Sequence, residues 1–446
     1  MDVQITPRRL AGTLTPPPSK SLAHRVVLAE LLAGKDTFSV PADLSEDIRA
    51  TVRCAAALRK RGLAAGPGNG PESGAKAAES GDSLESRAKH ADAAGERTAF
   101  GDAGGVKDWY AVETGTARLP LLDCGESGST LRFLLPIALA LRGDAVFAGH
   151  GRLLDRPLGP YREAFTEKGV RWERQGDRLA VRGQLMPGRY RLSGSVSSQF
   201  VTGLLFALPL LDGESEIVLT SPLESAVYVD MTLDVLARAG IVVENDGYQR
   251  FRVPGGQQYQ AVNLPLEADW SQAAFWCAAN FLENRVTLRG LRMESVQGDR
   301  AIVPLFRKMA SPQPIPVEID LSGIPDLLPP LAVMAAWRTS PTTFTRAARL
   351  RLKESDRLDS VETLLRTFQV SVKTGPDWMT VDGGIPDHCP PVTVDGCGDH
   401  RIVMAAAVLA SVWEAPVTIL GAEAVNKSYP AFFDHYRQLG GEIHVL

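Results

Sequence analysis

The chain has 446 residues, of which 44% are hydrophobic and 22% charged, which is ordinary for a globular protein and favours about two to three domains. Its formal net charge of −4 at pH 7 excludes a general basic field that would recruit nucleic acid or a membrane surface, so any anion-binding arginine must act locally. Five scattered cysteines with no Cys-x-x-Cys pair indicate neither a disulfide framework nor a metal site.

The N-terminus shows no charged region followed by an apolar core, and no apolar run reaches the roughly 18 residues of a membrane span. We therefore expect a cytoplasmic protein without a signal peptide. We also expect small-molecule ligands, no metal or organic cofactor, no nucleic-acid or membrane partner, and a monomer.

Taken in chain order, six small or polar openings each lead directly into a long apolar helical stretch. They are Ser19–Ser21, Ser127–Ser129, Ser197–Gln199, Asp269–Ser271, Ile324–Asp326 and Gly398–His400. Roughly 26 to 32 residues after each opening an amphipathic helix begins, near Ser45, Arg156, Tyr228, Asp299, Asp356 and Pro430. The apolar helices are predicted to be buried between other elements and the amphipathic helices to lie outside them.

Short β-branched or alternating runs between the helices predict strands. Four lie at 145–147, 216–219, 285–288 and 416–419, and three follow a glycine that ends a helix, at 170–172, 241–243 and 442–445. Six α/β units with buried helices favour two globular domains of three units with a cleft between them. Residues 64–108 contain almost no large apolar side chain and are predicted to form a flexible, low-complexity insertion.

Several helix openings carry side chains suited to anions. Lys20 and Arg25 lie at the start of an apolar helix, where free backbone N–H groups and the helix dipole already favour a negative charge. Arg357 and Arg401 each follow acidic residues at the mouth of a helix, and the guanidinium fork suits a carboxylate. Asp326 fits a general base and a simple N-cap about equally well. The openings together indicate a site for a phosphorylated ligand.

Eight motifs in a fixed order resemble those of the enolpyruvyl transferase family, and within it the enzymes that act on shikimate 3-phosphate. They are Lys20-Ser21-x-x-His24-Arg25, Gly194–Gln199, Tyr228–Thr232, Glu267–Asp269, Ile324–Asp326, Lys353–Arg357, Asp399–Arg401 and Lys427–Pro430. The resemblance covers nearly the whole chain outside residues 64–118.

The resemblance implies an α/β fold: a two-domain inverse barrel built from six repeated βαβαββ-type units. It implies that residues 1–19 and 267–446 form one domain and residues 20–266 the other, with the 64–108 insertion inside the latter. It also implies transfer of the enolpyruvyl group of phosphoenolpyruvate to the 5-hydroxyl of shikimate 3-phosphate with release of phosphate, without a cofactor. That reaction serves chorismate and aromatic amino-acid biosynthesis.

Positions carried over from the family give two expected ligand sets. The set for shikimate 3-phosphate is Lys20, Ser21, Arg25, Ser197, Ser198, Gln199, Ser225, Tyr228, Asp326 and Lys353. The set for phosphoenolpyruvate is Lys20, Gly128, Arg156, Gln199, Arg357, Arg401 and Lys427. The expected catalytic groups are Asp326 as base and Glu354 as acid, with Lys20 and His400 contributing.

The sequence departs from the family pattern at two positions and leaves alternatives open. Glu126 and Arg349 stand where the family usually has asparagine, so either a neighbouring cation, with Arg349 as a candidate, neutralises Glu126 or the affinity for the ligand is altered. One alternative function is that of a UDP-N-acetylglucosamine enolpyruvyl transferase, although the loop cysteine of that family has no clear counterpart here. Another is a catalytically weakened ligand-binding relative.

Overall fold

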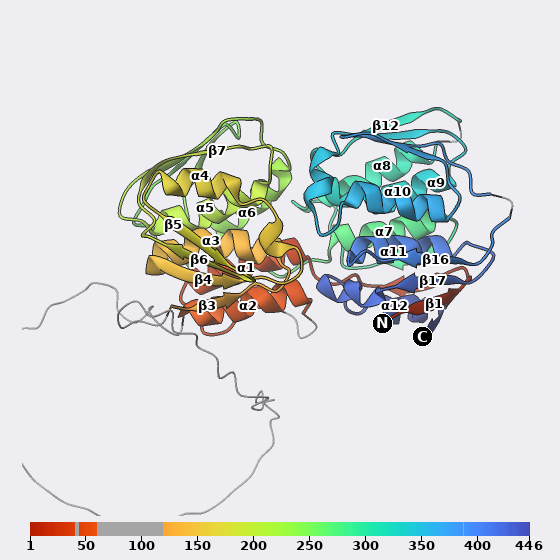
Figure 1. Cartoon of the computed structure of the whole chain (residues 1–446), viewed down its shortest axis with the longest axis horizontal. Helices are drawn as coiled ribbons and strands as arrows, with labels where there is room; N and C mark the ends of the chain where they lie inside the picture. Colours follow the sequence, from red (N-terminus) through yellow and green to blue (C-terminus); the bar gives the residue numbers. More distant parts are fainter. Residues whose placement is uncertain (41–43, 60–118, 312, 387) are drawn as a thin grey trace, which may run out of the picture.

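The described elements of the computed structural model lie in two lobes that stand side by side (Figure 1). The structure describes residues 1–40, 44–59, 119–311, 313–386 and 388–446. The insertion predicted at 64–108 lies outside these residues. We call the lobe that contains α1 the central lobe. The lobe that contains both chain ends is the terminal lobe.

The central lobe follows the predicted alternation of helices and strands. Its elements are α1 (Lys20–Leu32), α2 (Glu46–Arg59), β3 (Leu121–Asp123), α3 (Gly128–Arg142), β4 (Asp144–Ala148), η1 (Leu153–Asp155), α4 (Gly159–Thr166), β5 (Arg171–Gln175), β6 (Arg178–Arg182), β7 (Gly188–Leu192), α5 (Ser198–Ala207), η2 (Leu208–Leu210), β8 (Ser215–Leu219), α6 (Ala226–Arg238), β9 (Glu244–Asp246) and β10 (Arg250–Val253).

The terminal lobe combines two N-terminal strands with the last part of the chain. Its elements are β1 (Val3–Thr6), β2 (Ala11–Leu14), α7 (Trp270–Phe281), β11 (Arg285–Leu288), η3 (Gly298–Ala301), α8 (Ile302–Met309), β12 (Val317–Asp320), η4 (Pro325–Leu327), α9 (Leu328–Trp337), β13 (Thr342–Thr345), η5 (Ala348–Leu352), α10 (Arg357–Thr367), β14 (Val372–Thr374), β15 (Met379–Val381), β16 (Val392–Asp395), α11 (His400–Ala410), β17 (Val417–Leu420), η6 (Ala422–Lys427), α12 (Phe432–Gln438) and β18 (Glu442–Val445).

The sheets repeat one pattern of strand pairing. Among the described residues, four four-stranded sheets have the orders β3-β4-β6-β5, β7-β8-β10-β9, β12-β13-β15-β14 and β16-β17-β1-β18. In each, the first pair is parallel and the next two pairs are antiparallel. Strands β11 and β2 form a parallel pair of their own. The predicted repeated α/β architecture is confirmed.

The apolar helices are buried, as their patterns predict. In α1 every residue from Leu22 to Leu32 is buried, whereas α2 buries only one face, which includes Ile48, Cys54 and Leu58. Helices α1, α3 and α5 contribute to one hydrophobic core and α7, α9 and α11 to another. Burial of such helices on all sides fixes the positions of their N-termini, which is where the polar openings lie.

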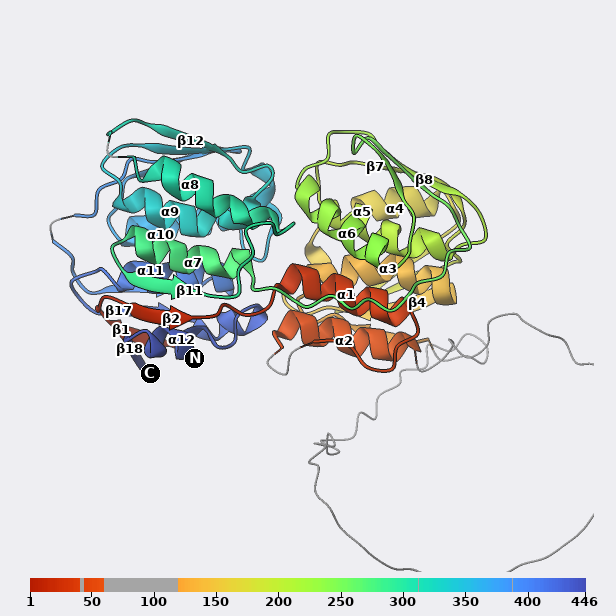
Figure 2. The ribbon, with the colours of Figure 1, turned by 180° about the vertical axis from the view of Figure 1, so that it is seen from behind.

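Two chain segments join the lobes and lie against each other. Pro18 and Ala268 form an antiparallel bridge, and Ser19 N donates to Glu267 O at 2.8 Å. Figure 2 shows the red segment after β2 and the green segment before α7 crossing between the lobes. Asp269 accepts from Lys20 N through Oδ2 and from Ser271 N through Oδ1, both at 2.8 Å. Its carboxylate thus caps a helix of each lobe, a role that the sequence did not indicate.

The strand expected at 241–243 is displaced, because β9 begins only at Glu244. The backbone groups of the residues before β9 form hydrogen bonds outside any strand pair. Ile241 N donates to Leu236 O and closes the end of α6, and Val242 exchanges two hydrogen bonds with the Gln257 side-chain amide. An amide side chain therefore takes the hydrogen-bonding groups that a neighbouring strand would need.

Close packing of α3 against α5 depends on Gly203. A Cβ at this position would lie 2.2 Å from Tyr161 Oη and 2.4 Å from Arg132 O. Although alanine favours a helix over glycine by about 1 kcal/mol, overpacking costs about 1–3 kcal/mol or more.

We expect Gly203→Ala to lower the free energy of unfolding by about 2 kcal/mol, measured by urea denaturation. Gly159→Ala, at the first residue of α4 and 3.8 Å from its nearest neighbour, is the control and should change stability by less than about 1 kcal/mol. Equal stability of the two variants would contradict the packing argument.

Candidate functional site

A polar cavity of about 740 Å³, part of it open to solvent, lies between the two lobes. Every site residue predicted from the sequence lines it except Lys427. The lining residues are Lys20, Ser21, Arg25, Asp47, Gly128, Ser129, Phe133, Arg156, Ser197, Ser198, Gln199, Ser225, Tyr228, Pro325, Asp326, Arg349, Lys353, Glu354, Arg357, His400 and Arg401. Residues from five of the six buried-helix openings therefore meet in one cavity.

Helix N-termini supply much of the wall of this cavity. Helices α1, α3 and α5 begin with serine N-caps whose hydroxyls accept from backbone N–H groups of the first turn. Helix α11 begins with Asp399, which accepts from Arg401 N at 3.0 Å. Free N–H groups and helix dipoles directed at one space make it suitable for a multiply charged anion.

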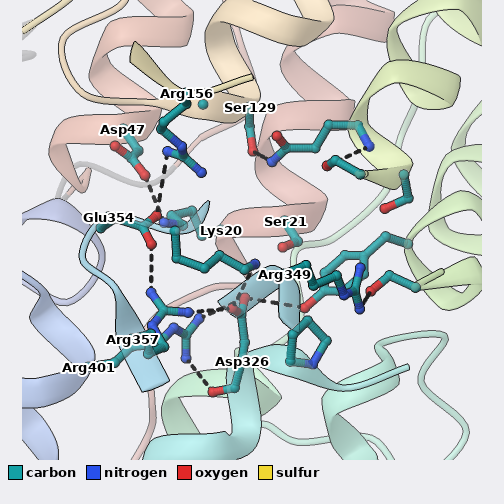
Figure 3. A pocket seen from close by; sticks show the side chains of 18 of the residues that line it. Lys20, Ser21, Asp47, Ser129, Arg156, Asp326, Arg349, Glu354, Arg357 and Arg401 are labelled. Atoms are coloured by element: carbon teal, nitrogen blue, oxygen red, sulfur yellow. Dashed lines mark hydrogen bonds and ion pairs between the residues drawn. The ribbon is translucent and has the colours of Figure 1, made fainter. Parts of the chain in front are cut away.

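Asp326 holds the centre of the terminal-lobe side (Figure 3). Its Oδ1 lies 2.9 Å from Arg357 Nη1 and 3.3 Å from Lys353 Nζ, and its Oδ2 lies 3.2 Å from Arg401 Nη2. Burial raises the pKa of Asp326, but Arg401, Lys353 and Arg357 together lower it well below its usual range. The carboxyl group is therefore ionised at neutral pH.

Arg357 connects three carboxylates and is itself completely buried. Besides Asp326 it contacts Asp399, with Nε 3.0 Å from Oδ2, and Glu354, with Nη2 2.6 Å from Oε2. Burial raises the pKa of Glu354, but Arg357 foremost and Arg156 hold it well below its usual range. Glu354 is thus a carboxylate when no ligand is present. The planar guanidinium can contact three carboxylates through its three nitrogen atoms, which the single ammonium group of a lysine could not do with the same geometry.

On the central-lobe side, arginines and hydroxyl groups face the cavity. Arg25 donates to Thr232 Oγ1 at 2.9 Å and to Tyr228 O at 2.7 Å, and burial lowers its pKa to about 10. Gln199 accepts from Arg132 at 2.6 Å and donates to Ser129 Oγ at 2.9 Å. These contacts fix the orientation of side chains that are expected to meet the ligands.

Two further cavity residues have their charge set by burial. Burial, with Lys20 and Arg401, lowers the pKa of His400 to about 3, so its ring is neutral, and neither ring nitrogen has a hydrogen-bond partner among the described residues. Burial lowers the pKa of Lys353 to about 8, although Asp326 acts in the opposite direction. Lys353 therefore remains mostly cationic at neutral pH, while His400 offers only a neutral imidazole.

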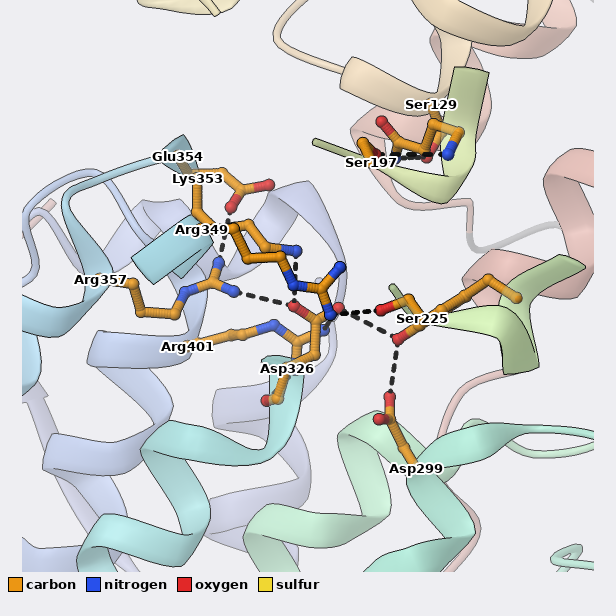
Figure 4. Close-up of polar contacts among 12 residues, drawn as sticks. Ser129, Ser197, Ser225, Asp299, Asp326, Arg349, Lys353, Glu354, Arg357 and Arg401 are labelled. Carbon is orange, nitrogen blue, oxygen red and sulfur yellow. Dashed lines mark hydrogen bonds and ion pairs between the residues drawn. The ribbon is translucent and has the colours of Figure 1, made fainter. Parts of the chain in front are cut away.

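A neighbouring cation neutralises Glu126, but the candidate Arg349 is not that cation. Arg349 lies 2.8 Å from Glu224 and 2.6 Å from Ser225 Oγ instead, beside the cluster around Asp326 (Figure 4). The cation that neutralises Glu126 is Lys427, which also donates to Gly398 O at 2.8 Å. Arg349 follows β13 and is directed towards the N-terminus of α6, whereas Glu126 precedes α3 beside η6. The Glu126–Lys427 pair joins the two lobes.

Sequence reasoning missed some polar residues near the cavity. Arg132 is buried on an apolar helix, the same signal that singled out Arg25, and could have been found. Asp47, 2.7 Å from Lys20 Nζ, begins an amphipathic helix and carries no such signal. Within the described ranges no three His, Cys, Asp or Glu side chains cluster as metal ligands, and none of the described helices is long and apolar enough to cross a membrane.

Comparison with known proteins identifies the family of the chain and its fold. The family model described as EPSP synthase (3-phosphoshikimate 1-carboxyvinyltransferase) matches residues 110–436. A Clostridium kluyveri protein named 3-phosphoshikimate 1-carboxyvinyltransferase is 37% identical, over 99% of this chain and 98% of its own. The EPSP synthase structure from Acinetobacter baumannii has a TM-score of 0.68 at 21% identity, covering 100% of both chains. The enolpyruvyl transferase NikO from Streptomyces tendae gives the same TM-score at 17% identity, over 99% of this chain and 98% of its own.

The fold is that of the enolpyruvyl transferase class. Within that class, the matched family model and the full-length similarity decide the branch. The chain belongs to the EPSP synthase (3-phosphoshikimate 1-carboxyvinyltransferase) family.

The Glu126–Lys427 pair predicts a measurable competition. Lys427 is predicted to bind phosphoenolpyruvate, and its ammonium group is paired with Glu126. Glu126→Asn should therefore free Lys427 and tighten phosphoenolpyruvate binding. An ion pair with one partly exposed member is worth about 0.2–1 kcal/mol, so we expect about a 1.4- to fivefold lower Kd by calorimetry. The control is Glu423→Gln, because this η6 carboxylate pairs with the N-terminal amine and not with Lys427. An unchanged Kd for Glu126→Asn would show that the carboxylate does not compete.

Proposed function

We propose that the protein transfers the enolpyruvyl group of phosphoenolpyruvate to the 5-hydroxyl of shikimate 3-phosphate and releases phosphate, a step towards chorismate and the aromatic amino acids. The observation that carries this proposal is the grouping of cations from both lobes around the buried Asp326, in a chain of this family. Two phosphorylated substrates need such a charge density in a site that excludes water.

The proposed shikimate 3-phosphate site joins the helix openings of α1 and α5 to the terminal lobe. Its residues are Lys20, Ser21, Arg25, Ser197, Ser198, Gln199, Ser225, Tyr228, Asp326 and Lys353. The serine hydroxyls and the α5 N-terminus suit the phosphate, and Asp326 suits a ring hydroxyl. The assignment is supported by the fact that all of these residues line the same cavity.

The proposed phosphoenolpyruvate site is the more cationic part of the cavity. Its residues are Lys20, Gly128, Arg156, Gln199, Arg357 and Arg401, together with Lys427, which lies outside the cavity lining. Gly128 supports the assignment because a Cβ there would lie 2.8 Å from Arg156 Nη1, so only glycine lets this guanidinium lie over the first turn of α3. A phosphate can then meet the guanidinium and backbone N–H groups together.

In the proposed reaction, Asp326 takes the proton of the 5-hydroxyl, and the electron pair of that O–H bond forms a bond to C2 of phosphoenolpyruvate. Glu354 gives a proton to the methylene carbon in the same addition. In the elimination, the methyl group returns a proton to Glu354 while the C–O bond to phosphate breaks. The phosphate leaves one proton short, and the proton that the protein took from the 5-hydroxyl returns to the phosphate or to solvent before the next turnover.

Glu354 must carry a proton to act as the acid, whereas Arg357 and Arg156 keep it ionised. Phosphoenolpyruvate supplies the change, because its negative charges compete for Arg357 and Arg156 and raise the pKa of the neighbouring carboxyl. His400 and Lys20 contribute in different ways. The neutral His400 ring can donate a hydrogen bond but not act as a cationic acid, and Lys20 is placed to stabilise developing charge.

We also propose domain boundaries between residues 19 and 20 and between 266 and 267. The separate hydrophobic cores on either side of the paired crossover segments support them. Each lobe then forms one rigid body, and closure about the crossover would bring the two ligand sets together.

A phosphate-release assay with phosphoenolpyruvate tests the proposed function. Shikimate 3-phosphate should support turnover and UDP-N-acetylglucosamine should not, and Asp326→Asn should lower kcat by about 10²–10⁴-fold because it removes the general base. The control is Asp320→Asn, a half-exposed β12 carboxylate beside Arg346, which should keep wild-type activity. Turnover with the nucleotide sugar but not with shikimate 3-phosphate would refute the proposal.

A further inference from the structure

A second carboxyl group lies behind the wall of the cavity, on the far side of Tyr228. Asp299, in η3, is only 5% exposed and is not among the residues that line the cavity. The Tyr228 hydroxyl lies 3.2 Å from Asp299 Oδ2 and 3.4 Å from Asp326 Oδ2. A phenol has one proton, so it can donate to only one of the two carboxyl groups at a time. The three groups form a short chain that begins at Asp326 and ends at Asp299.

This chain crosses from one lobe to the other and back. Tyr228 belongs to α6 of the central lobe, whereas both carboxyl groups belong to the terminal lobe. Gly298 allows the approach, because a Cβ at that position would lie 2.4 Å from Val227 Cγ2. Figure 4 shows the Asp299 carboxyl group directed towards the cluster around Asp326. The contact is therefore made only when the lobes adopt this arrangement.

The two carboxyl groups differ in their affinity for a proton. Three cations contact Asp326, but no described cation contacts Asp299, and its Oδ1 has no hydrogen-bond partner among the described residues. Burial, with Asp326 and Asp269, raises the pKa of Asp299 to about 7, while Arg401 and the Ser271 hydroxyl act against this increase. Transfer of a proton from Asp326 to Asp299 is therefore favourable in free energy.

We propose that Asp299 receives, through the Tyr228 hydroxyl, the proton that Asp326 takes from the acceptor hydroxyl, and thereby returns Asp326 to its ionised form. In this step the proton on Asp326 bonds to Tyr228 Oη while the original Tyr228 proton bonds to Asp299, so neither charge nor protons are gained or lost. Asp299 is a positioning residue, because it acts on the substrate only through Tyr228 and Asp326. The inference rests on the proposed function.

The dependence of kcat on pH tests this inference. Above pH 7 Asp299 is ionised and can accept the proton, whereas below pH 7 it is already protonated and the transfer is blocked. Wild-type kcat should therefore fall as the pH decreases through about 7. Asp299→Asn keeps an acceptor for the Tyr228 hydroxyl but cannot take a proton. We expect it to lower kcat at pH 8 by about 10–100-fold, to change both KM values by less than about twofold, and to lose this inflection.

Two further variants separate proton transfer from a structural role. Asp299→Glu should restore part of kcat together with the inflection, because it restores a carboxyl group. The matched control is Asp230→Asn. Asp230 lies on α6 like Tyr228, but it does not line the cavity, and its Oδ1 accepts a hydrogen bond of 2.6 Å from the Tyr248 hydroxyl. This variant should keep the wild-type profile.

The outcomes are distinguishable. An active wild-type protein together with an Asp299→Asn variant of unchanged kcat and pH profile would overturn the inference alone. Equal loss of activity and of thermal stability in Asp299→Asn and Asp299→Glu would assign Asp299 a structural role and also overturn it. Absence of wild-type turnover with both substrates at every pH would instead refute the proposed function, and the inference with it.

Discussion

The structure depends on keeping the Asp326 carboxylate ionised inside the protein. An isolated buried carboxylate costs several kcal/mol, and so does each buried cation, so the group is stable only as an assembled cluster. Lys353, Arg357 and Arg401 supply the positive charge, and they come from two separate segments of the terminal lobe, residues 353–357 and the start of α11. The apolar helices that place these segments must therefore pack tightly. The positions at which the buried helices begin are those that bring the charged groups of the site together.

The two lobes divide the work of this cluster unequally. The terminal lobe holds the dense group of carboxylates and cations around Arg357, whereas the central lobe contributes hydroxyl groups, helix N-termini and more widely spaced cations. Contacts between the lobes include polar pairs, such as Arg349 with Ser225 and Lys427 with Glu126. Polar contacts can exchange for ligand contacts at low cost, which suits a cleft that admits charged substrates.

Much of the fold could be predicted from local patterns in the sequence, whereas most site residues were predicted from the resemblance of ordered motifs to those of a known family. The helix openings at Lys20 and Asp326 were found through polar residues that interrupt apolar helices. What could not be predicted depends on contacts between distant segments. No sequence pattern indicates that Asp269 caps helices in both lobes, that Lys427 and not Arg349 meets Glu126, or that Gly298 lets Tyr228 reach Asp299. Those pairings are set by the packing of the lobes.

A crystal structure with shikimate 3-phosphate bound tests the central claim most directly. If the ionised Asp326 is the base that the cluster exists to hold, the 5-hydroxyl oxygen should lie about 2.6–3.2 Å from its carboxylate, with Lys353, Arg357 and Arg401 still in contact with the same group. A complex in which the 5-hydroxyl lies against another residue, with Asp326 contacting only its three cations, would contradict the account.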